Sequence, residues 1–219
     1  MKSEIVHIPV TGGYLTGNLV LPDDPTALVI FSHGSGSSRL SPRNSFIAKG
    51  LQEAGMATFL FDLLTEREDE ELLSRFNIDL LSGRLILATI QLRKNPRLKQ
   101  LPLGYFGAST GAASALHAAA WLPDTVKAVV SRGGRPDLAE VYLPDVKAAT
   151  LLVVGEKDEE VLQMNRSALE KLTCEKSLQV VKGASHLFEE QGALEQVQEL
   201  AADWFSVHLV NSMTTPTHA

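Results

Sequence analysis

Three side chains of this 219-residue sequence have the types and the order along the chain that nucleophilic catalysis requires: Ser109, Asp158 and His186. A serine hydroxyl is a weak nucleophile at neutral pH, so it needs an imidazole base. The imidazole in turn needs a carboxylate that fixes its tautomer and stabilises its charged form. Serine, then acid, then histidine is one of the chain orders in which such triads occur. The pattern predicts acyl transfer through a covalent intermediate on Ser109.

The surroundings of Ser109 strengthen this prediction. The run Gly-Ala-Ser-Thr-Gly at 107–111 follows an apolar run that ends at Phe106 and precedes an Ala-rich helical pattern at 110–121. A serine held on a tight turn between a strand and a helix needs small neighbours, because the two elements approach each other closely there. The motif alone is weak evidence, since a tight strand-to-helix turn with a serine cap has the same composition.

The acid and the base each follow a predicted strand. Asp158 comes after the apolar run at 150–155, and His186 follows the last such run at 178–181. Asp137 is a rival acid, but Asp158 is favoured because it precedes the histidine by a single strand and helix. The remaining histidines lie in a predicted hairpin, in mid-helix, at a helix end and in the terminal segment, and compete poorly as the base: His7, His117, His208 and His218.

Two backbone amides are candidates for an oxyanion hole. The amide of Thr110, at the start of the predicted helix, would point toward a developing negative charge. The second donor is expected from the Gly/Ser-rich loop at 32–38, where we choose the amide of Ser35. A flexible Gly/Ser connection or a phosphate cradle are the alternatives, although no Gly-Lys-Ser/Thr follows. His33 is interpreted as a structural residue beneath this turn.

The elements that must position these groups form an α/β pattern. Residues 5–10 and 14–21 alternate apolar and polar side chains and predict an antiparallel hairpin. Apolar runs of the kind that strands buried on both faces show follow at 27–32, 57–61, 103–108, 126–131, 150–155 and 178–181. Helical patterns separate them at 45–54, 78–94, 110–121, 159–172 and 193–209. We therefore expect a mostly parallel sheet of about eight strands, with helices on both faces.

Residues 1–210 form one domain in this prediction, and 211–219 form a flexible C-terminal tail. The interval 131–150 holds material for about one short helix, so we expect no cap domain and an exposed site. Several arginines follow strands at the same edge and are candidates to bind an acidic substrate group, or else to pair with acids such as Asp62 or Asp137: Arg39, Arg43, Arg132 and Arg135. The first three of the four are predicted to bind substrate.

Composition narrows the class of protein. The net charge is −6, which disfavours binding to nucleic acid or to an anionic membrane. A single cysteine, Cys174, cannot form an intramolecular disulfide, no long apolar run is present, and the histidines are too scattered for a metal site. We expect a cytoplasmic protein that needs no cofactor or metal and acts on a small molecule. The sequence makes no prediction about oligomeric state.

The motifs together resemble the α/β-hydrolase superfamily and, within it, the dienelactone hydrolase-like group. The resemblance lies in segments at 33–39, 41–44, 61–65, 104–111, 155–158 and 183–186. It implies a serine hydrolase with Ser109 as nucleophile, Asp158 as acid, His186 as base, and the amides of Ser35 and Thr110 as oxyanion donors. Dienelactone hydrolases proper use a cysteine nucleophile where this sequence has serine, so their substrate is not carried over.

The resulting prediction is a carboxylic ester hydrolase that acts on small or medium acyl groups through an acyl-enzyme on Ser109. Two alternatives stay open. One is a non-catalytic binding or regulatory protein that keeps the serine turn only for folding. The other is a triad enzyme that uses a thioester, peptide or other acyl donor. The Arg-rich segments also resemble a subgroup in which some members are fused to a phosphoribosyltransferase domain, which these 219 residues do not include.

Overall fold

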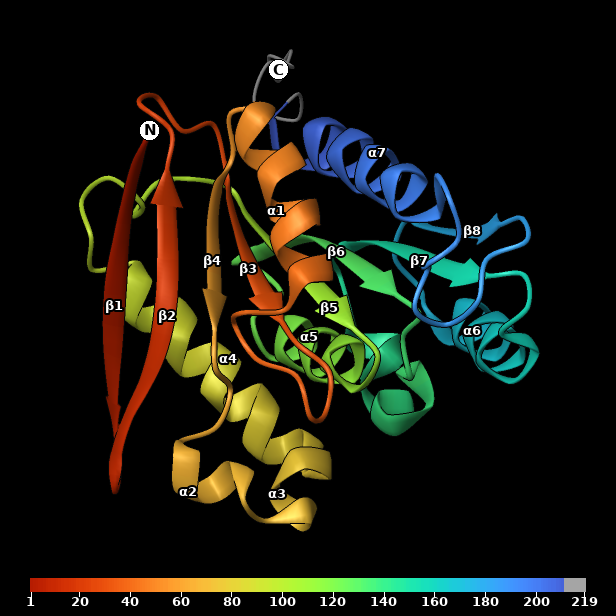
Figure 1. Ribbon diagram of the computed structural model, residues 1–219, viewed down its shortest axis with the longest axis horizontal. Coiled ribbons are helices and arrows are strands. Elements are labelled where there is room, and N and C mark those ends of the chain that lie inside the picture. Colours follow the sequence, from red (N-terminus) through yellow and green to blue (C-terminus); the bar gives the residue numbers. More distant parts are fainter. Residues whose placement is uncertain (211–219) are drawn as a thin grey trace.

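A central sheet of eight strands organises the molecule, in the order β1-β2-β4-β3-β5-β6-β7-β8 (Figure 1). It is seen in a computed structural model that describes residues 1–210. The strands are β1 (Lys2–Val10), β2 (Gly13–Leu21), β3 (Leu28–Ser32), β4 (Ala57–Phe61), β5 (Leu103–Ala108), β6 (Val126–Arg132), β7 (Ala149–Gly155) and β8 (Lys176–Val181). The predicted strands are thus all present, with ends that shift by a few residues at most.

β1 and β2 form the expected antiparallel hairpin, and β2 also lies antiparallel to β4. All the other neighbouring pairs are parallel. The carboxyl ends of the parallel strands therefore meet at one edge of the sheet, where sites in open α/β sheets collect. We call this edge, from β4 to β8, the catalytic edge, because the residues predicted to be catalytic follow its strands.

Helices cover both faces of the sheet. They are α1 (Pro42–Glu53), α2 (Glu66–Asp69), α3 (Leu72–Phe76), α4 (Ile78–Leu92), α5 (Thr110–Trp121), η1 (Pro136–Asp145), α6 (Glu159–Lys171), α7 (Ala193–Phe205) and η2 (Ser206–Val210). Helices α1 and α7 pack on one face, and α4, α5, η1 and α6 pack on the other. The predicted helical pattern at 193–209 divides at Ser206, where α7 ends and the wider turns of η2 begin.

Alternation along β3 explains how one strand serves two cores. Leu28 and Ile30 belong to the core cluster under α4 and α5, whereas Val29 and Phe31 belong to the cluster under α1 and α7. Successive side chains of a strand point to opposite faces, so a strand covered on both sides needs apolar residues throughout. The uninterrupted apolar runs of the sequence therefore specify a sheet with two cores.

Only η1 lies between β6 and β7, so the described chain has no cap domain in that interval. The short helices α2 and α3 were not predicted as helices. α2 starts at a capping box, in which the Thr65 hydroxyl accepts from the Glu68 amide and the Glu68 carboxylate accepts from the Thr65 amide. Both lie just beyond the catalytic edge, below the ends of β3 and β4 in Figure 1.

The predicted tail at 211–219 lies outside the residues that the structure describes. Within residues 1–210, none of the helices combines the length and apolar character that crossing a bilayer would require.

Candidate active site

Ser109 occupies a strained turn between β5 and α5. Its backbone has φ 53° and ψ −124°, a region that residues other than glycine rarely adopt. The turn is held from both sides, because the Ser109 amide donates to the Arg132 carbonyl at 3.1 Å and the Ser109 carbonyl accepts from the Arg135 amide at 3.1 Å. These hydrogen bonds stabilise a backbone conformation at Ser109 that is unfavourable for a residue with a side chain.

Small residues on either side of Ser109 let the elements approach each other. A Cβ atom on Gly107 would lie 2.5 Å from the Cα of Ala112, and one on Gly111 would lie 2.2 Å from the carbonyl oxygen of Ser32. Real Cβ atoms do not come so close to backbone atoms, so any larger residue would force α5 away from β3 and β5. The two glycines of the sequence motif are therefore needed for packing.

His186 and Asp158 meet across the ends of β7 and β8. The Nδ1 atom of His186 lies 2.5 Å from Oδ2 of Asp158, with the aspartate side chain 15% exposed and the histidine 39% exposed. Their loops are bound together, since the Lys157 amide donates to the Ala184 carbonyl at 2.9 Å. The arrangement orients the imidazole so that its Nε2 is available to a partner.

The rival acid has another partner. Both carboxylate oxygens of Asp137 accept hydrogen bonds from Arg135, from Nε at 2.9 Å and from Nη2 at 2.7 Å. This bidentate pair raises the pKa of Arg135, with the side-chain hydrogen bond as the main cause. The structure thus brings Asp158, and not Asp137, to His186.

The three predicted triad residues gather around one short backbone segment. Arg132 binds the amide of Ser109, and a Cβ on the next residue, Gly133, would lie 3.4 Å from Cε1 and Nδ1 of the His186 ring. Among the described residues the Ser109 hydroxyl has no hydrogen-bond partner. Hydrogen bonds between a nucleophile and its base are often long before substrate binds, so this open geometry is compatible with a serine and histidine pair.

The loop after β3 faces the Ser109 hydroxyl. A Cβ on Gly34 would lie 3.1 Å from the Cβ of Ser109, so the loop backbone contacts the serine directly. The amide of Ser35 donates to the Thr110 hydroxyl at 2.8 Å. This contact was not predicted, because the sequence gives both residues a role through their amides and none to the Thr110 hydroxyl. An oxyanion that uses the Ser35 amide must therefore take the place of the Thr110 hydroxyl.

His33 holds this loop in place, as the sequence suggested. Its Nε2 accepts from the Leu63 amide at 3.1 Å, and its Nδ1 lies 2.9 Å from the Gly34 carbonyl. Because Nε2 accepts a hydrogen bond, it carries no proton, and because Nδ1 faces a carbonyl oxygen, it carries one. The two contacts therefore indicate that the ring is neutral. Burial lowers the pKa of His33, which favours the same neutral form.

The arginines at the catalytic edge divide into paired and unpaired groups. Arg39 makes a salt bridge with Asp62 through Nη1, and its amide donates to the same carboxylate at 2.8 Å. Arg43 contacts Glu189 at 3.2 Å. Arg132 is buried, and its Nε and Nη1 have no hydrogen-bond partner among the described residues. Substrate binding by the three stays a prediction, but Arg39 is already neutralised.

The other histidines in the described chain lie away from the triad. His117 is buried, stacks on Tyr142 with ring centroids 3.6 Å apart, and accepts from Trp121 at 2.9 Å. That packing explains a histidine in mid-helix without a catalytic role. Within residues 1–210, no group of three or more His, Cys, Asp or Glu side chains is arranged to hold a metal ion.

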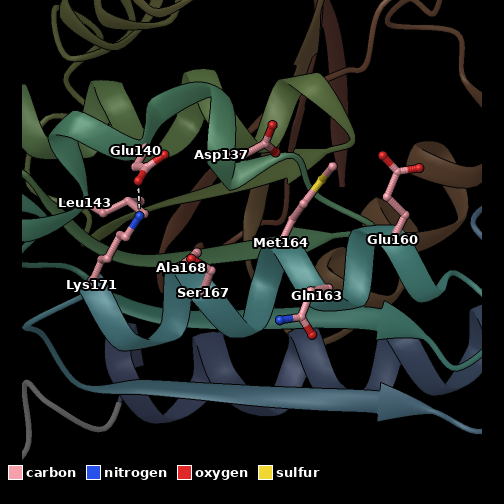
Figure 2. Close-up of a pocket in the computed structure, with 9 residues that line it drawn as sticks. All are labelled: Asp137, Glu140, Leu143, Glu160, Gln163, Met164, Ser167, Ala168 and Lys171. Carbon is pink, nitrogen blue, oxygen red and sulfur yellow. Dashed lines mark hydrogen bonds and ion pairs between the residues drawn. The ribbon is translucent and has the colours of Figure 1, made fainter.

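A separate pocket of about 530 Å³ lies between η1 and α6 (Figure 2). We call it the η1–α6 groove. Asp137 and Glu160 lie toward the starts of the two helices, and an ion pair between Glu140 and Lys171 links them farther along. None of the predicted triad residues lines it. This groove could not be predicted from the sequence. The residues of α6 indicate only an amphipathic helix, and those of η1 show no periodic pattern.

The sequence and the fold both have counterparts among known proteins. Residues 16–209 match the family described as the dienelactone hydrolase family. The chain belongs to this family. Among solved structures, a dienelactone hydrolase from Anabaena variabilis is 53% identical and superposes with a TM-score of 0.91, over 95% of this chain and 98% of that one. Both findings confirm the α/β-hydrolase fold inferred from the motifs.

More distant members of the fold show the same architecture. Est1E from Butyrivibrio proteoclasticus has a TM-score of 0.81 at 16% identity, over 93% of this chain and 98% of that one.

A Mycobacterium tuberculosis relative, provisionally named a phosphoribosyl transferase, is 50% identical over 209 residues, which is 95% of this chain and 47% of the relative. The chain, a member of the dienelactone hydrolase family, therefore spans about half the length of the curated relatives that it matches.

Proposed function

We propose that this chain is a serine hydrolase that cleaves carboxylic esters of small or medium acyl groups. The observation that carries the proposal is the strained turn at Ser109, with φ 53°, close to a histidine whose Nδ1 lies 2.5 Å from a carboxylate. Strain of this kind persists where surrounding structure holds it in place, and it concentrates at functional sites. Membership of a hydrolase family supports the same class of reaction.

The first half of the reaction forms an acyl-enzyme. The Ser109 hydroxyl attacks the ester carbonyl, and its proton passes to Nε2 of His186. Asp158 accepts a hydrogen bond from Nδ1 and stabilises the imidazolium that results. The imidazolium then gives its proton to the departing alcohol oxygen as the carbon–oxygen bond breaks. In the second half, His186 removes a proton from water, and the hydroxide attacks the acyl carbonyl. His186 then returns the proton to the Ser109 oxygen as the acid leaves, which regenerates the free enzyme.

Negative charge on the carbonyl oxygen would be stabilised by backbone amides. The amide of Thr110 is among the first in α5, where helix amides lack intrahelical acceptors. The Ser35 amide is the second donor, and it now donates to the Thr110 hydroxyl at 2.8 Å. An oxyanion accepts more strongly than a neutral hydroxyl, so this exchange of partners favours the transition state.

The name of the Mycobacterium tuberculosis relatives suggests a different activity, phosphoribosyl transfer. Those proteins are about twice as long as the matched region, since the match covers 47% of their length. We assign such an activity to the part of the relatives outside the match, because the matched region of this chain carries the serine turn and the histidine and aspartate pair. The same features disfavour the alternative of a purely binding or regulatory protein.

Hydrolysis of p-nitrophenyl acetate and butyrate by the wild-type chain and a Ser109→Ala variant tests the proposal. We expect turnover that disappears in the variant, together with labelling of the wild-type serine by a fluorophosphonate. Turnover of thioesters or peptides in preference to esters would keep the nucleophile but change the acyl donor. Equal activity of wild type and variant, without labelling of Ser109, would overturn the proposed function.

A further inference from the structure

Arg132 is a buried positive charge that lacks a counter-charge. The residue is 8% exposed, and its Nε and Nη1 are shielded from solvent without a hydrogen-bond partner. No carboxylate within residues 1–210 forms an ion pair with it. Buried arginines are almost always paired, because removing a charge from water is costly unless an opposite charge replaces the solvent. Such a guanidinium therefore has donor groups available for an anion.

A second arginine faces the first. Alternate residues of β6 point to the same face, and Ala128 and Val130 belong to the core cluster beneath α1 and α7. Arg132, two residues farther along, leaves the sheet on this face, where Arg43 lies in the first turn of α1. Burial, and to a lesser extent the charge of Arg43, lower the pKa of Arg132 to about 10, so Arg132 is still cationic at neutral pH.

Little negative charge offsets this pair. Glu189, 66% exposed, contacts Arg43 at 3.2 Å but forms no ion pair with Arg132. The first turn of α1 contains no acidic residue, although a helix N-terminus favours negative charge. By contrast, Asp62 and Asp137 neutralise Arg39 and Arg135 at the same edge. Among these four arginines of the described chain, only Arg132 has no ion pair, and the partner of Arg43 is an exposed side chain.

The pair lies next to the reacting groups. The carbonyl of Arg132 accepts from the Ser109 amide at 3.1 Å, and the following residue, Gly133, packs against the His186 ring. Ala108, which precedes the serine, is the register partner of Arg132 in the neighbouring strand, and such strands lie about 4.8 Å apart. The backbone of Arg132 is therefore anchored directly beside the turn that carries Ser109.

We propose that Arg132 and Arg43 form a subsite for an anionic group, a carboxylate or a phosphate, that the ester carries a few bonds from the scissile carbonyl. The inference rests on the proposed function and specifies its substrate class as acidic esters. The planar guanidinium fork matches both anions, and the substrate would supply the counter-charge that the protein lacks.

Matched esters with one leaving group test the subsite. p-Nitrophenyl butyrate and mono-p-nitrophenyl succinate have acyl chains of the same length, and only the second ends in a carboxylate. The p-nitrophenyl ester of 3-phosphonopropionate replaces that carboxylate with a phosphate-like group. The ratio of kcat/KM for each anionic ester to kcat/KM for butyrate measures anion recognition, because leaving-group chemistry cancels. Comparing the two anionic esters decides which anion is preferred.

We expect Arg132→Met to lower this ratio at least about tenfold, since hydrogen bonds to charged groups contribute that much or more. Arg43→Met should lower it less, because Arg43 also contacts Glu189. Arg132→Lys keeps the charge but loses the fork, so an intermediate ratio is expected, and this variant also serves if the methionine variant does not fold. The exposed Arg166 of α6 provides the control, and Arg166→Met should leave the ratio unchanged.

A melting experiment measures the subsite without turnover. Succinate and inorganic phosphate, used as probes, should raise the Tm of the wild-type protein and of Ser109→Ala more than that of Arg132→Met. Equal ratios and equal Tm shifts in wild type and Arg132→Met would overturn the subsite while Ser109-dependent butyrate hydrolysis upholds the proposed function. Loss of all Ser109-dependent hydrolysis would overturn the function instead, and the Tm shifts would then decide the subsite alone.

Discussion

The catalytic edge around Ser109 and the η1–α6 groove are neighbouring regions. They differ in how many of their polar and charged groups have partners within the described chain. Arg135 joins them, because its amide binds the Ser109 carbonyl and its guanidinium binds Asp137 at the groove. The groove is a roomy pocket in which two of the acids on its rim have cationic partners. The edge instead holds a strained backbone and, among residues 1–210, a serine hydroxyl without a hydrogen-bond partner and a buried arginine without an ion-pair partner.

This difference shows where chemistry is to be sought in the molecule. A pocket in which most of the charges are paired offers room but few reactive groups. Unsatisfied donors and a strained turn cost folding free energy, and a fold retains them where they act on something else. We therefore place the reaction at the edge, although the groove is a well-formed pocket with a volume of about 530 Å³.

The largest expected effect tests the edge directly. Ser109→Ala should lower kcat by about four orders of magnitude or more, because residues of a triad act as a unit. The stability of the variant should stay close to that of the wild type, since alanine meets the same strain at φ 53°. Steady-state kinetics and thermal melting measure the two quantities. A loss of less than tenfold would mean that another group is the nucleophile.

The second prediction compares the two acids that the sequence left in competition. Asp158→Asn should lower kcat by about 10³ to 10⁴, since the amide cannot stabilise the imidazolium that forms on His186. Asp137→Asn is the matched control, and it should cost less than about tenfold because it alters only the pair with Arg135. Kinetics with one neutral ester measures both. A larger loss in Asp137→Asn would reverse the assignment of the acid.

Much of this edge could be predicted from the sequence, and the reasons are local. The strand, turn and helix around Ser109 are specified by neighbouring residues, so β5 and α5 match the predicted ranges 103–108 and 110–121. The meeting of Asp158 with His186 follows from parallel strands ending at one edge. Arg39 pairs with Asp62, which was one of the two alternatives that the sequence left open. What could not be predicted depends on groups far apart in the chain, such as the contact of the Ser35 amide with the Thr110 hydroxyl and the lack of an ion-pair partner for Arg132 within residues 1–210.

The groove lay beyond sequence reasoning for a related reason. It is formed by η1, whose ten residues include Pro144 and a non-helical Ala139, so no periodic pattern marks it. Its volume depends on how η1 packs on α6, which residues separated by a strand decide together. Similarly, the short helices α2 and α3 span four and five residues, too few for a periodic pattern to mark them.

A smaller effect concerns the loop that holds Gly34 against Ser109. The Nε2 atom of His33 must stay unprotonated to accept from the Leu63 amide, and burial lowers the pKa of the ring below its usual 6.5. Between the lowered pKa and 6.5 the unfolded chain binds more protons than the folded one, so stability falls as the pH falls through this range. The stability is fully present above 6.5.

Thermal melting between pH 7.5 and pH 5 measures this loss. We expect Tm to fall with pH in the wild type and to fall by a few degrees less in His33→Gln, which keeps a donor and an acceptor but does not titrate. His7→Gln serves as the control, because His7 lies in the hairpin far from the loop, and its melting profile should match that of the wild type. Identical profiles for His33→Gln and the wild type would remove His33 as the source of acid sensitivity.

The smallest effect is expected in the groove, and it asks whether the two regions work separately. Met164→Trp should fill part of the groove, since Met164 projects toward Asp137 there (Figure 2). Hydrolysis of p-nitrophenyl acetate should change less than about twofold, because no triad residue lines the groove and an acetyl group needs no extended pocket. A series of p-nitrophenyl esters from acetate to octanoate measures the dependence on chain length.

Parallel loss of activity across the series would mean that the groove supports the structure of the edge. Loss confined to the longer esters would mean that the groove holds the end of the acyl chain. Either result would join the two regions into one site, and an unchanged series would show that the reaction depends on the edge alone.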